Sequence, residues 1–461
     1  MSKYLYGASI QGIQEFIFKT NKLAQIVGAS EILKSIHDDF EQSYRVNNHE
    51  IYLNAAGNIK IILSDKNALE KIVKEFPKKV MQKAYGISIS QAVVEINNNN
   101  PTTNELKLLD DKLKAGRNKA AIPLDIRFSI MDFVRNTARP SVPNEKKISN
   151  TEKIDKGSLQ KYKKSDKNEI SAIKNKKNKI AVIHADGNNL GDLIPNLENI
   201  SDFSKNLNKA IKEAFDMATK TIKKDKFREI ILGGDDMTII CDADFALDFT
   251  KIYLTKFEEL TTKFKKYPLT ACAGIAFCNE KFPFHYAINL AESLCGVAKN
   301  HTKNLNPNEP SSCLMFHNVQ SSNFQTWDKF VQDELSVKSQ NISFDFGPYY
   351  LNKQNQPSIE NLIEVCRNYA DERSPISSLR EWIRVLDNKS YAEFMLDRIN
   401  EMLDRINEML DRSWADREFI SKLFANLSNK HLITKKDGKN KTPIYDILQI
   451  HAVTQKIKER L

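Results

Sequence analysis

The sequence predicts an α+β fold with two ferredoxin-like domains followed by a C-terminal helical domain. The order strand–helix–strand–strand–helix–strand can be traced twice along the chain, which is typical of the split ferredoxin-like arrangement. A lysine-rich segment without apolar periodicity separates the two copies, and the pattern after residue 320 is mainly helical. We therefore expect a first domain at residues 1–140, a linker at 141–178, a second domain at 179–320 and a helical domain at 321–461.

The composition is that of a soluble globular protein. Of the 461 residues, 41% are hydrophobic and 28% are charged. No apolar run approaches the roughly 18 residues of a membrane span, and the N-terminus has no signal-peptide pattern. We therefore expect a cytoplasmic protein with no membrane partner.

The cysteines are scattered singly along the chain. No two form a C-x-x-C pair, so neither a zinc knuckle nor a disulfide framework is predicted. The six are Cys241, Cys272, Cys278, Cys295, Cys313 and Cys366.

The net charge of +10 suggests an anionic partner, which could be nucleic acid, nucleotide or both. Much of the surplus lies between Lys146 and Lys179, among Ser, Asn and Asp residues. Such a run is more often a solvated linker than a binding surface. We interpret it as a linker, and RNA binding stays open as an alternative.

The first copy begins with a strand at Tyr4–Ile10. A turn at Gly12 leads into a long amphipathic helix with an expected break near Gly28. The hairpin that follows turns through Ala56, Gly57 and Asn58, without a carboxylate. The other expected elements are strands at Ile51–Ala55, Ile59–Leu63 and Ile87–Ile96, a helix at about 68–84, a basic helix at 104–120, an extended piece at Pro123–Phe133 and a boundary at Arg139-Pro140.

The second copy repeats this order around a hairpin at Ile230–Ile240. Beyond it, the unit M-L-D-R-I-N-E recurs at Met395, Met402 and Met409, which predicts a lengthened, packed helix, since so few heptads do not establish a coiled coil. The other expected elements are strands at Lys179–Ala185 and Leu269–Cys278 and helices at Phe203–Ile222, Phe245–Phe264 and Pro283–Asn300.

The tip of the second hairpin reads Gly-Gly-Asp-Asp. Gly233 and Gly234 can supply the positive φ angles of a tight turn, and Asp235 and Asp236 would begin the return strand. Two adjacent carboxylates repel each other unless a cation lies between them, and magnesium is the natural one. An ordinary solvated turn is the alternative.

A third carboxylate, Asp186, ends the first strand of the second copy within A-D-G-N-N-L-G. In a ferredoxin-like sheet the first strand neighbours the hairpin, so Asp186 should lie beside Asp235 and Asp236. Three such carboxylates can hold two Mg²⁺ (or Mn²⁺) ions roughly 4 Å apart for phosphoryl transfer. Gly187 and Gly191 would let phosphates approach the backbone.

Three polar residues have two interpretations each. Asn188 and Asn189 could bind ribose or base, or could simply form a turn. Lys299, at the end of L-A-E-S-L-C-G-V-A-K, could contact a triphosphate, or could be an ordinary lysine at a helix C-terminus.

Five motifs follow one another in the second copy: A-D-G-N-N-L-G, L-G-G-D-D-M-T-I-I, A-G-I-A-F, K-F-P-F-H-Y-A and A-E-S-L-C-G-V-A-K. With these motifs the second copy resembles the catalytic palm of the large polymerase-like subunit of type III CRISPR effector complexes. The N-terminal Y-G-A-S-I-Q-G-I-Q-E-F-I-F and K-L-A-Q-I-V-G-A-S-E-I-L are similar to that subunit's first, non-catalytic palm. The resemblance implies a nucleotidyl cyclase-like fold that makes cyclic oligoadenylates from ATP, with one nucleotide on each palm.

The resemblance also assigns roles to residues. Asp235 and Asp236 match the family's metal-binding GGDD, and Asp186 matches the leading aspartate of its other metal motif. Lys299 matches a lysine that contacts phosphates. The backbone of Gly187, Gly233 and Gly234 belongs to the same motifs. Gly28, Ala29 and Ser30 match the G-A-S motif of the first palm, which places Ser30 near the second nucleotide.

The chain departs from the family pattern in three ways. It enters the first palm at once, so it is expected to be a trimmed form without the HD nuclease domain, and His37-Asp38 is interpreted as surface. The cysteine-bearing domain between the palms is replaced by the lysine-rich segment. Asn188 stands where an aspartate is common.

Three functions follow as hypotheses. The first is a nucleotidyltransferase that converts ATP to a cyclic oligoadenylate signal in antiviral defence. The second is a catalytically silent scaffold that binds RNA or other effector-complex subunits. The third is a GTP-using cyclase of the GGDEF kind.

Overall fold

We describe the protein from a computed structural model. It describes residues 3–20, 22–44, 49–55, 57–98, 101–118, 128, 130–143, 153–165, 172–193, 200–262, 269–320, 326–371, 374–410, 419–428 and 430–455. Two compact units are formed, one by Met1–Glu169, Asn189–Lys209 and Glu229–Asp235, the other by Ile170–Asn188, Ala210–Arg228 and Asp236–Leu461. Most of the extended piece expected at Pro123–Phe133 lies outside the described residues.

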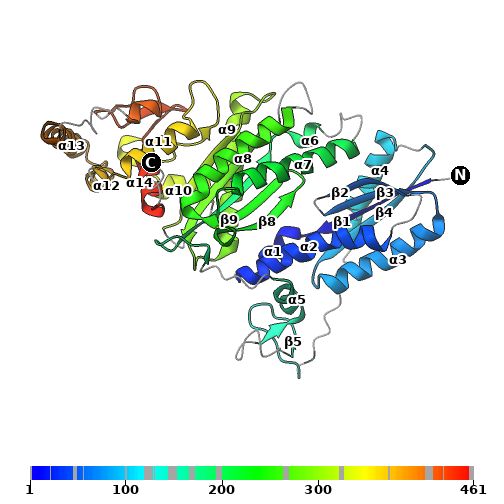
Figure 1. Cartoon of the computed structure of the whole chain (residues 1–461). Coiled ribbons are helices and arrows are strands. Elements are labelled where there is room, and N and C mark those ends of the chain that lie inside the picture. The colour runs from blue at the N-terminus through cyan, green and yellow to red at the C-terminus, as the bar shows by residue number, and fades with distance from the viewer. Residues whose placement is uncertain are drawn as a thin grey trace. The chain divides into compact units, whose positions relative to one another are not determined.

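The first unit contains a four-stranded antiparallel sheet in the order β2-β3-β1-β4. This is the strand order of a ferredoxin-like sheet, as the sequence predicted. Figure 1 shows the helices of this unit in blue and cyan around the sheet. The elements are β1 (Lys3–Gln11), α1 (Ile13–Phe18), α2 (Leu23–Ser43), β2 (His49–Ala55), β3 (Asn58–Leu63), α3 (Lys66–Lys83), β4 (Ser88–Ile96) and α4 (Thr103–Arg117).

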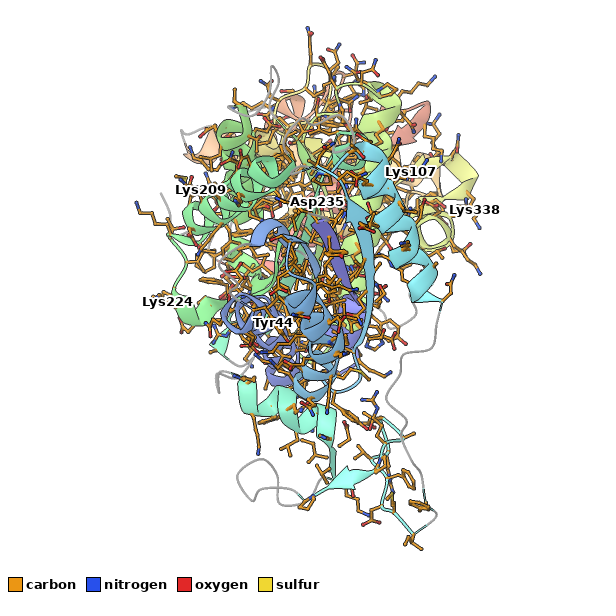
Figure 2. All side chains as sticks on the ribbon, turned by 90° about the vertical axis from the view of Figure 1, so that its right-hand side faces the viewer. Tyr44, Lys107, Lys209, Lys224, Asp235 and Lys338 are labelled. Atoms are coloured by element: carbon orange, nitrogen blue, oxygen red, sulfur yellow. The ribbon has the colours of Figure 1, made fainter. Side chains whose placement is uncertain are left out.

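Alternation along β1 places its residues on two faces of the sheet. Leu5 packs with Leu109 and Leu113 of α4 in one core. Tyr44, which follows α2 as its C-cap and is labelled in Figure 2, packs against Phe76 of α3 with ring centroids 6.2 Å apart. The first sheet therefore lies between α4 and the pair α2–α3.

The expected helix break near Gly28 is wrong. The helix is interrupted between α1 and α2, and Gly28 lies inside α2. Glycine is needed there for another reason, because a Cβ on Gly28 would lie 1.8 Å from the carbonyl oxygen of Lys161. Close approach of two backbones, rather than a helix break, explains this glycine.

The segment interpreted as a linker contains ordered structure. Its elements are β6 (Ile154–Asp155), which pairs with β5 (Ser141–Val142), and α5 (Lys156–Lys164), which packs on α2. The side chain of Asp155 accepts from the Ser158 N–H and caps α5. Lys161 is buried and donates to the carbonyl of Phe16, so its aliphatic stem packs while its charge finds a backbone partner. The high lysine content of this segment led to its interpretation as a linker, so the packed helix α5 was not predicted.

The second sheet has the order β14-β11-β10-β7-β9-β8. Its part β10-β7-β9-β8 repeats the ferredoxin-like order. Figure 1 shows α8 running along this sheet. The elements are β7 (Lys179–Gly187), α6 (Leu190–Leu193), α7 (Ile200–Thr219), β8 (Phe227–Gly233), β9 (Asp236–Asp242), α8 (Ala246–Thr261), β10 (Ala271–Asn279), α9 (Phe284–Leu305), β11 (Cys313–Asn318) and β14 (Tyr349–Tyr350).

The C-terminal part is helical only in part. The predicted helical domain also contributes β14 to the second sheet and forms a small sheet in the order β12-β13-β16-β15. These strands have two or three residues each, too short for a recognisable alternation. The elements are α10 (Trp327–Glu334), β12 (Ser336–Val337), β13 (Ile342–Ser343), α11 (Ile359–Tyr369), α12 (Ile376–Arg384), α13 (Lys389–Leu410), β15 (Thr434–Lys436), β16 (Lys439–Lys441) and α14 (Ile444–Val453).

The two units that begin at Met395 and Met402 lie in α13, as expected for one lengthened helix, and the third, from Met409, extends beyond the described residues. Met395, Ile399 and Leu403 are buried at intervals of four residues, and α13 packs against α12. Among the helices described, none has the length and apolar character that a membrane crossing requires.

Candidate active site

The candidate site lies where β7 and β9 run side by side. These strands are antiparallel, and Asp186 is the register partner of Asp236 while His184 is that of Thr238. Since side chains two residues apart share one face of a strand, His184 and Asp186 point the same way. One ligand atom from each of His184, Asp186 and Asp236 lies within 4.8 Å of the others. The sequence prediction that Asp186 lies beside Asp236 is confirmed.

Of the two glycines expected in the β8–β9 turn, Gly233 and Gly234, only one has a positive φ. Gly234 has a φ of 71°, whereas Gly233 ends β8 as an ordinary strand residue. The N–H of Gly234 donates to Asn208 Oδ1 at 3.1 Å, which fixes the turn to α7. Positive φ at the first central residue is typical of a type II′ hairpin turn.

Asp235 occupies the second central position of this turn, before β9 begins at Asp236. The expectation that Asp235 begins the strand is therefore wrong by one residue. Figure 2 labels Asp235, and within the described residues it is not a member of the three-residue cluster. Its role as a metal ligand stays a prediction.

Lys299 projects from α9 onto the strand that carries Asp186. Its ammonium group forms an ion pair with Asp186 Oδ2 and donates to the carbonyl of Gly187 at 2.8 Å. The helix α9 continues to Leu305, so Lys299 lies before its last turn, outside the range in which the negative C-terminal end of a helix favours a lysine. Lys299 therefore lies against Asp186, a contact that the helix-end interpretation does not explain, and its contact with a triphosphate stays a prediction.

A glycine in β10 lets α9 lie close to the sheet. A Cβ on Gly274 would lie 1.9 Å from the carbonyl oxygen of Ala291 and 2.5 Å from the nitrogen of Cys295. Gly274 is also the register partner of His184. The close approach of α9 therefore covers the sheet face that holds the cluster and sets the reach of Lys299.

His184 is the site residue that the sequence analysis missed. Its Nδ1 lies 3.0 Å from Thr238 Oγ1, and burial lowers the pKa of its imidazole, with the nearby Lys299 adding to this and Asp186 opposing it. In the tautomer whose Nδ1–H donates to this hydroxyl, the other ring nitrogen, Nε2, carries the lone pair that a cation would need. The signal in the sequence was its spacing, two residues before Asp186 in a strand.

The two asparagines differ in environment. Asn188 is buried, and its side-chain nitrogen donates to Thr270 Oγ1 at 2.9 Å, so the side chain packs toward β10. Asn189 has a φ of 55°, the left-handed conformation in which asparagine is favoured. The turn-forming interpretation thus accounts for Asn189, and Asn188 supports the backbone between β7 and β10.

Other predicted residues can be placed as well. A Cβ on Gly191 or Gly233 would meet no atom within 4 Å, so the backbone at both positions is open to a ligand. Ser30 is buried, and its hydroxyl donates to the carbonyl of Ile230. Ser30 therefore has a structural hydrogen bond within the first unit.

The donor set fits a divalent cation. Two carboxylates and one neutral imidazole, with ligand atoms no more than 4.8 Å apart, could converge on one ion with ligand distances of about 2.1 Å after small adjustments. The two carboxylates would supply the negative charge that offsets the charge of the ion. Asp186 and Asp236 are the residues that would hold Mg²⁺ or Mn²⁺ here.

A ferredoxin-like sheet with carboxylates at the junction of its first strand and hairpin defines a palm-type domain. Residues 179–306 match the family model described as Cas10/Cmr2, second palm domain. The chain therefore carries a Cas10/Cmr2-type second palm domain, and the resemblance drawn from its sequence is confirmed.

Solved structures of similar fold come from Csm1–Csm4 cassettes. The cassette in complex with AMPPNP matches at 14% identity and a TM-score of 0.53 over 98% of this chain and 70% of that one. The cassettes with pppApA and with cA3 match at 14% identity and a TM-score of 0.54, over 98% of this chain and 69% and 70% of theirs. Two further Csm1–Csm4 matches cover 53% of the matched chain. No curated protein matches the sequence.

Proposed function

We propose that the chain is a nucleotidyltransferase that converts ATP to cyclic oligoadenylates in CRISPR-type antiviral defence. The observation that carries this proposal is the pairing of Asp186 with Asp236 beneath Lys299, inside the stretch that matches the Cas10/Cmr2 second palm. Csm1–Csm4 cassettes bound to pppApA and cA3 share the fold, which favours ATP as substrate over GTP. A protein of the Csm4 kind is the corresponding partner.

In this proposal each residue has a chemical task. Asp186 and Asp236 would hold the divalent cation, with Asp235, next to Asp236 in sequence, as a further ligand. A cation held there would lower the pKa of a ribose 3′-hydroxyl and would offset negative charge on the departing pyrophosphate. Lys299 places its ammonium on the triphosphate. The open backbone at Gly191 and Gly233 gives phosphates room to approach.

The first sheet would belong to a further palm domain that lacks metal ligands. On β1 and β3, Ser9 is the register partner of Asn58 next to the hairpin turn, at the positions that Asp186 and Asp236 occupy in the second sheet. A hydroxyl and an amide do not bind Mg²⁺ as carboxylates do. This copy would bind a nucleotide without activating it.

Incubation of the purified chain with labelled ATP and Mg²⁺ or Mn²⁺, followed by mass spectrometry, tests the proposal. We expect a phosphatase-resistant cyclic product. Asp186→Asn and the double change Asp235→Ala with Asp236→Ala should lower its rate by at least about 100-fold, since the charge stabilisation that a metal ion supplies is worth several kcal/mol. Asp225→Asn, in the segment before β8, is the matched control. Equal product from the double variant contradicts the proposal, and competition between ATP and GTP decides the base.

The silent scaffold is the second candidate. The ion pair between Lys299 and Asp186 compensates one carboxylate without a metal ion, so the site would be tolerated in a protein that performs no reaction. RNA or partner binding that falls steeply with salt, with no turnover of either nucleotide in their presence, would favour it.

A further inference from the structure

We propose that His184 is the third protein ligand of the cation at this site and that it makes the site prefer Mn²⁺ to Mg²⁺. This inference rests on the proposed function, because it names the ion that the carboxylates hold. Among the residues that the structure describes, His184, Asp186 and Asp236 are the group of three whose ligand atoms converge.

The geometry requires little movement. Two ligands that each lie about 2.1 Å from one ion are at most about 4.2 Å apart. The three ligand atoms already lie within 4.8 Å of one another, so shifts of at most about 0.7 Å each bring them into a common shell. All three residues belong to two neighbouring strands, whose hydrogen-bonded register fixes their spacing. Such a rigid base is suited to positioning metal ligands.

Thr238 holds the imidazole in a ligand orientation. A metal-binding histidine usually has its second ring nitrogen bonded to an oxygen, which fixes both the tautomer and the direction of the ring. Here Thr238 Oγ1 lies 3.0 Å from Nδ1, and Thr238 is the register partner of His184. The hydroxyl can accept the Nδ1 proton, which leaves the Nε2 lone pair for a cation.

The fold itself does not require a histidine at this position. In the first sheet the position of His184 corresponds to Gly7, because Gly7 lies two residues before Ser9 as His184 lies two before Asp186. A Cβ on Gly7 would lie 2.8 Å from Leu109 of α4, so apolar packing fills that face. All three donors are thus present in one sheet and absent from the equivalent positions of the other.

The chemistry of the donor set determines the choice of ion. Mg²⁺ is held through oxygen and keeps several waters, so an imidazole adds little to its binding. Nitrogen ligands suit first-row transition ions better, and Mn²⁺ accepts both carboxylate and imidazole. One imidazole beside two carboxylates should therefore raise the affinity for Mn²⁺ more than that for Mg²⁺.

Pulsed electron paramagnetic resonance of Mn²⁺ bound to the untagged, nucleotide-free chain tests the inference. We expect electron spin-echo modulation from a directly bound nitrogen, altered when the protein is made with ¹⁵N-histidine and lost in His184→Gln. The same variant should weaken Mn²⁺ binding by at least about tenfold and change Mg²⁺ binding by less than about threefold. His285→Gln, at the start of α9 and outside the cluster, should leave both unchanged.

The outcomes separate the inference from the proposed function. Mn²⁺ bound without nitrogen modulation, or modulation retained in His184→Gln, overturns the inference and leaves a carboxylate site intact. No binding of either ion overturns both. Should His184→Gln fail to fold by circular dichroism, wild type with ¹⁵N-histidine and Thr238→Val decide. The valine variant should keep the modulation and lose about tenfold in Mn²⁺ affinity, whereas no ¹⁵N effect in wild type overturns the inference.

Discussion

Lys299 provides a testable prediction because its ammonium group forms an ion pair with Asp186 Oδ2. Asp186 is one of the carboxylates that would bind the metal ion. A divalent cation and the ammonium therefore compete for Asp186 while no nucleotide is bound. When triphosphate arrives, the ammonium gains an alternative partner. We predict that Lys299→Met binds Mn²⁺ more tightly than wild type in the absence of nucleotide and binds ATP analogues more weakly.

The magnitude follows from the exposure of the pair. The side chains of Lys299 and Asp186 are 19% and 29% exposed, so solvent screens their attraction only in part. Two unit charges at about 4 Å attract by about 4 kcal/mol at an effective dielectric of 20, and exposed pairs yield 1 kcal/mol or less. A net value of about 1–2 kcal/mol lies between these limits. It corresponds to metal binding about 5–30-fold tighter in the variant.

Isothermal titration of untagged protein with Mn²⁺, with and without a non-hydrolysable ATP analogue, measures both effects. Lys303→Met is the matched control, since it removes the same charge from α9 one turn further along. The wild type should bind Mn²⁺ more tightly once the analogue is present, and Lys299→Met should lose most of that gain. Weaker Mn²⁺ binding by nucleotide-free Lys299→Met, or an effect equal to that of Lys303→Met, refutes the reasoning.

Two further predictions concern the second unit. Gly274→Ala should destabilise it by about 1–3 kcal/mol or more in thermal unfolding, because the new Cβ meets α9. Gly296→Ala should be neutral or stabilising, because a Cβ at that position meets no atom within 4 Å. The reverse order of stability of the two variants contradicts this prediction. Burial raises the pKa of the Asp446 carboxyl to about 7 from an ordinary value of 3.8. The folded state then holds the proton more tightly, so the free energy of unfolding should fall as pH rises from about 4 to 7. Urea unfolding at pH 5 and pH 8 should show this loss in wild type and not in Asp446→Asn, and parallel profiles would contradict it.

Much of the sheet architecture was predictable because alternation and turn residues are local signals. The strands of both ferredoxin-like sheets were expected within a few residues of where they lie. Contacts between distant segments left no such signal. The sequence around Gly28 predicts a helix break, because nothing local shows that the backbone of Lys161 packs against this glycine. Likewise the lysines of α5 predict a linker, because nothing local shows that this helix packs on α2. The short strands of the C-terminal part also lack a pattern long enough to detect.

The candidate site was predictable to the extent that motif and strand pairing determined it. The prediction placed Asp186 beside both Asp235 and Asp236, and the register bears this out for Asp236. It could not tell which of two adjacent aspartates faces the other strand, since a one-residue change in the turn exchanges them. The position of Gly234 in the turn settles this for Asp236. His184 was not predicted because a single histidine in an apolar strand has no signal of its own other than its spacing of two residues from Asp186.

The two sheets together separate what the fold needs from what the site adds. Each has a glycine of positive φ in its hairpin turn, Gly57 with 76° directly before β3 and Gly234 with 71° one residue further from β9, so a tight hairpin is common to both sheets although the glycine differs in position. The covering helices differ in what they bring to the sheet. In the first sheet α4 inserts Leu109 against Gly7, and in the second α9 brings Lys299 to Asp186. Because the same architecture closes with apolar contacts in one copy, the charged lining of the other is not a requirement of folding. It is the feature that a ligand must explain.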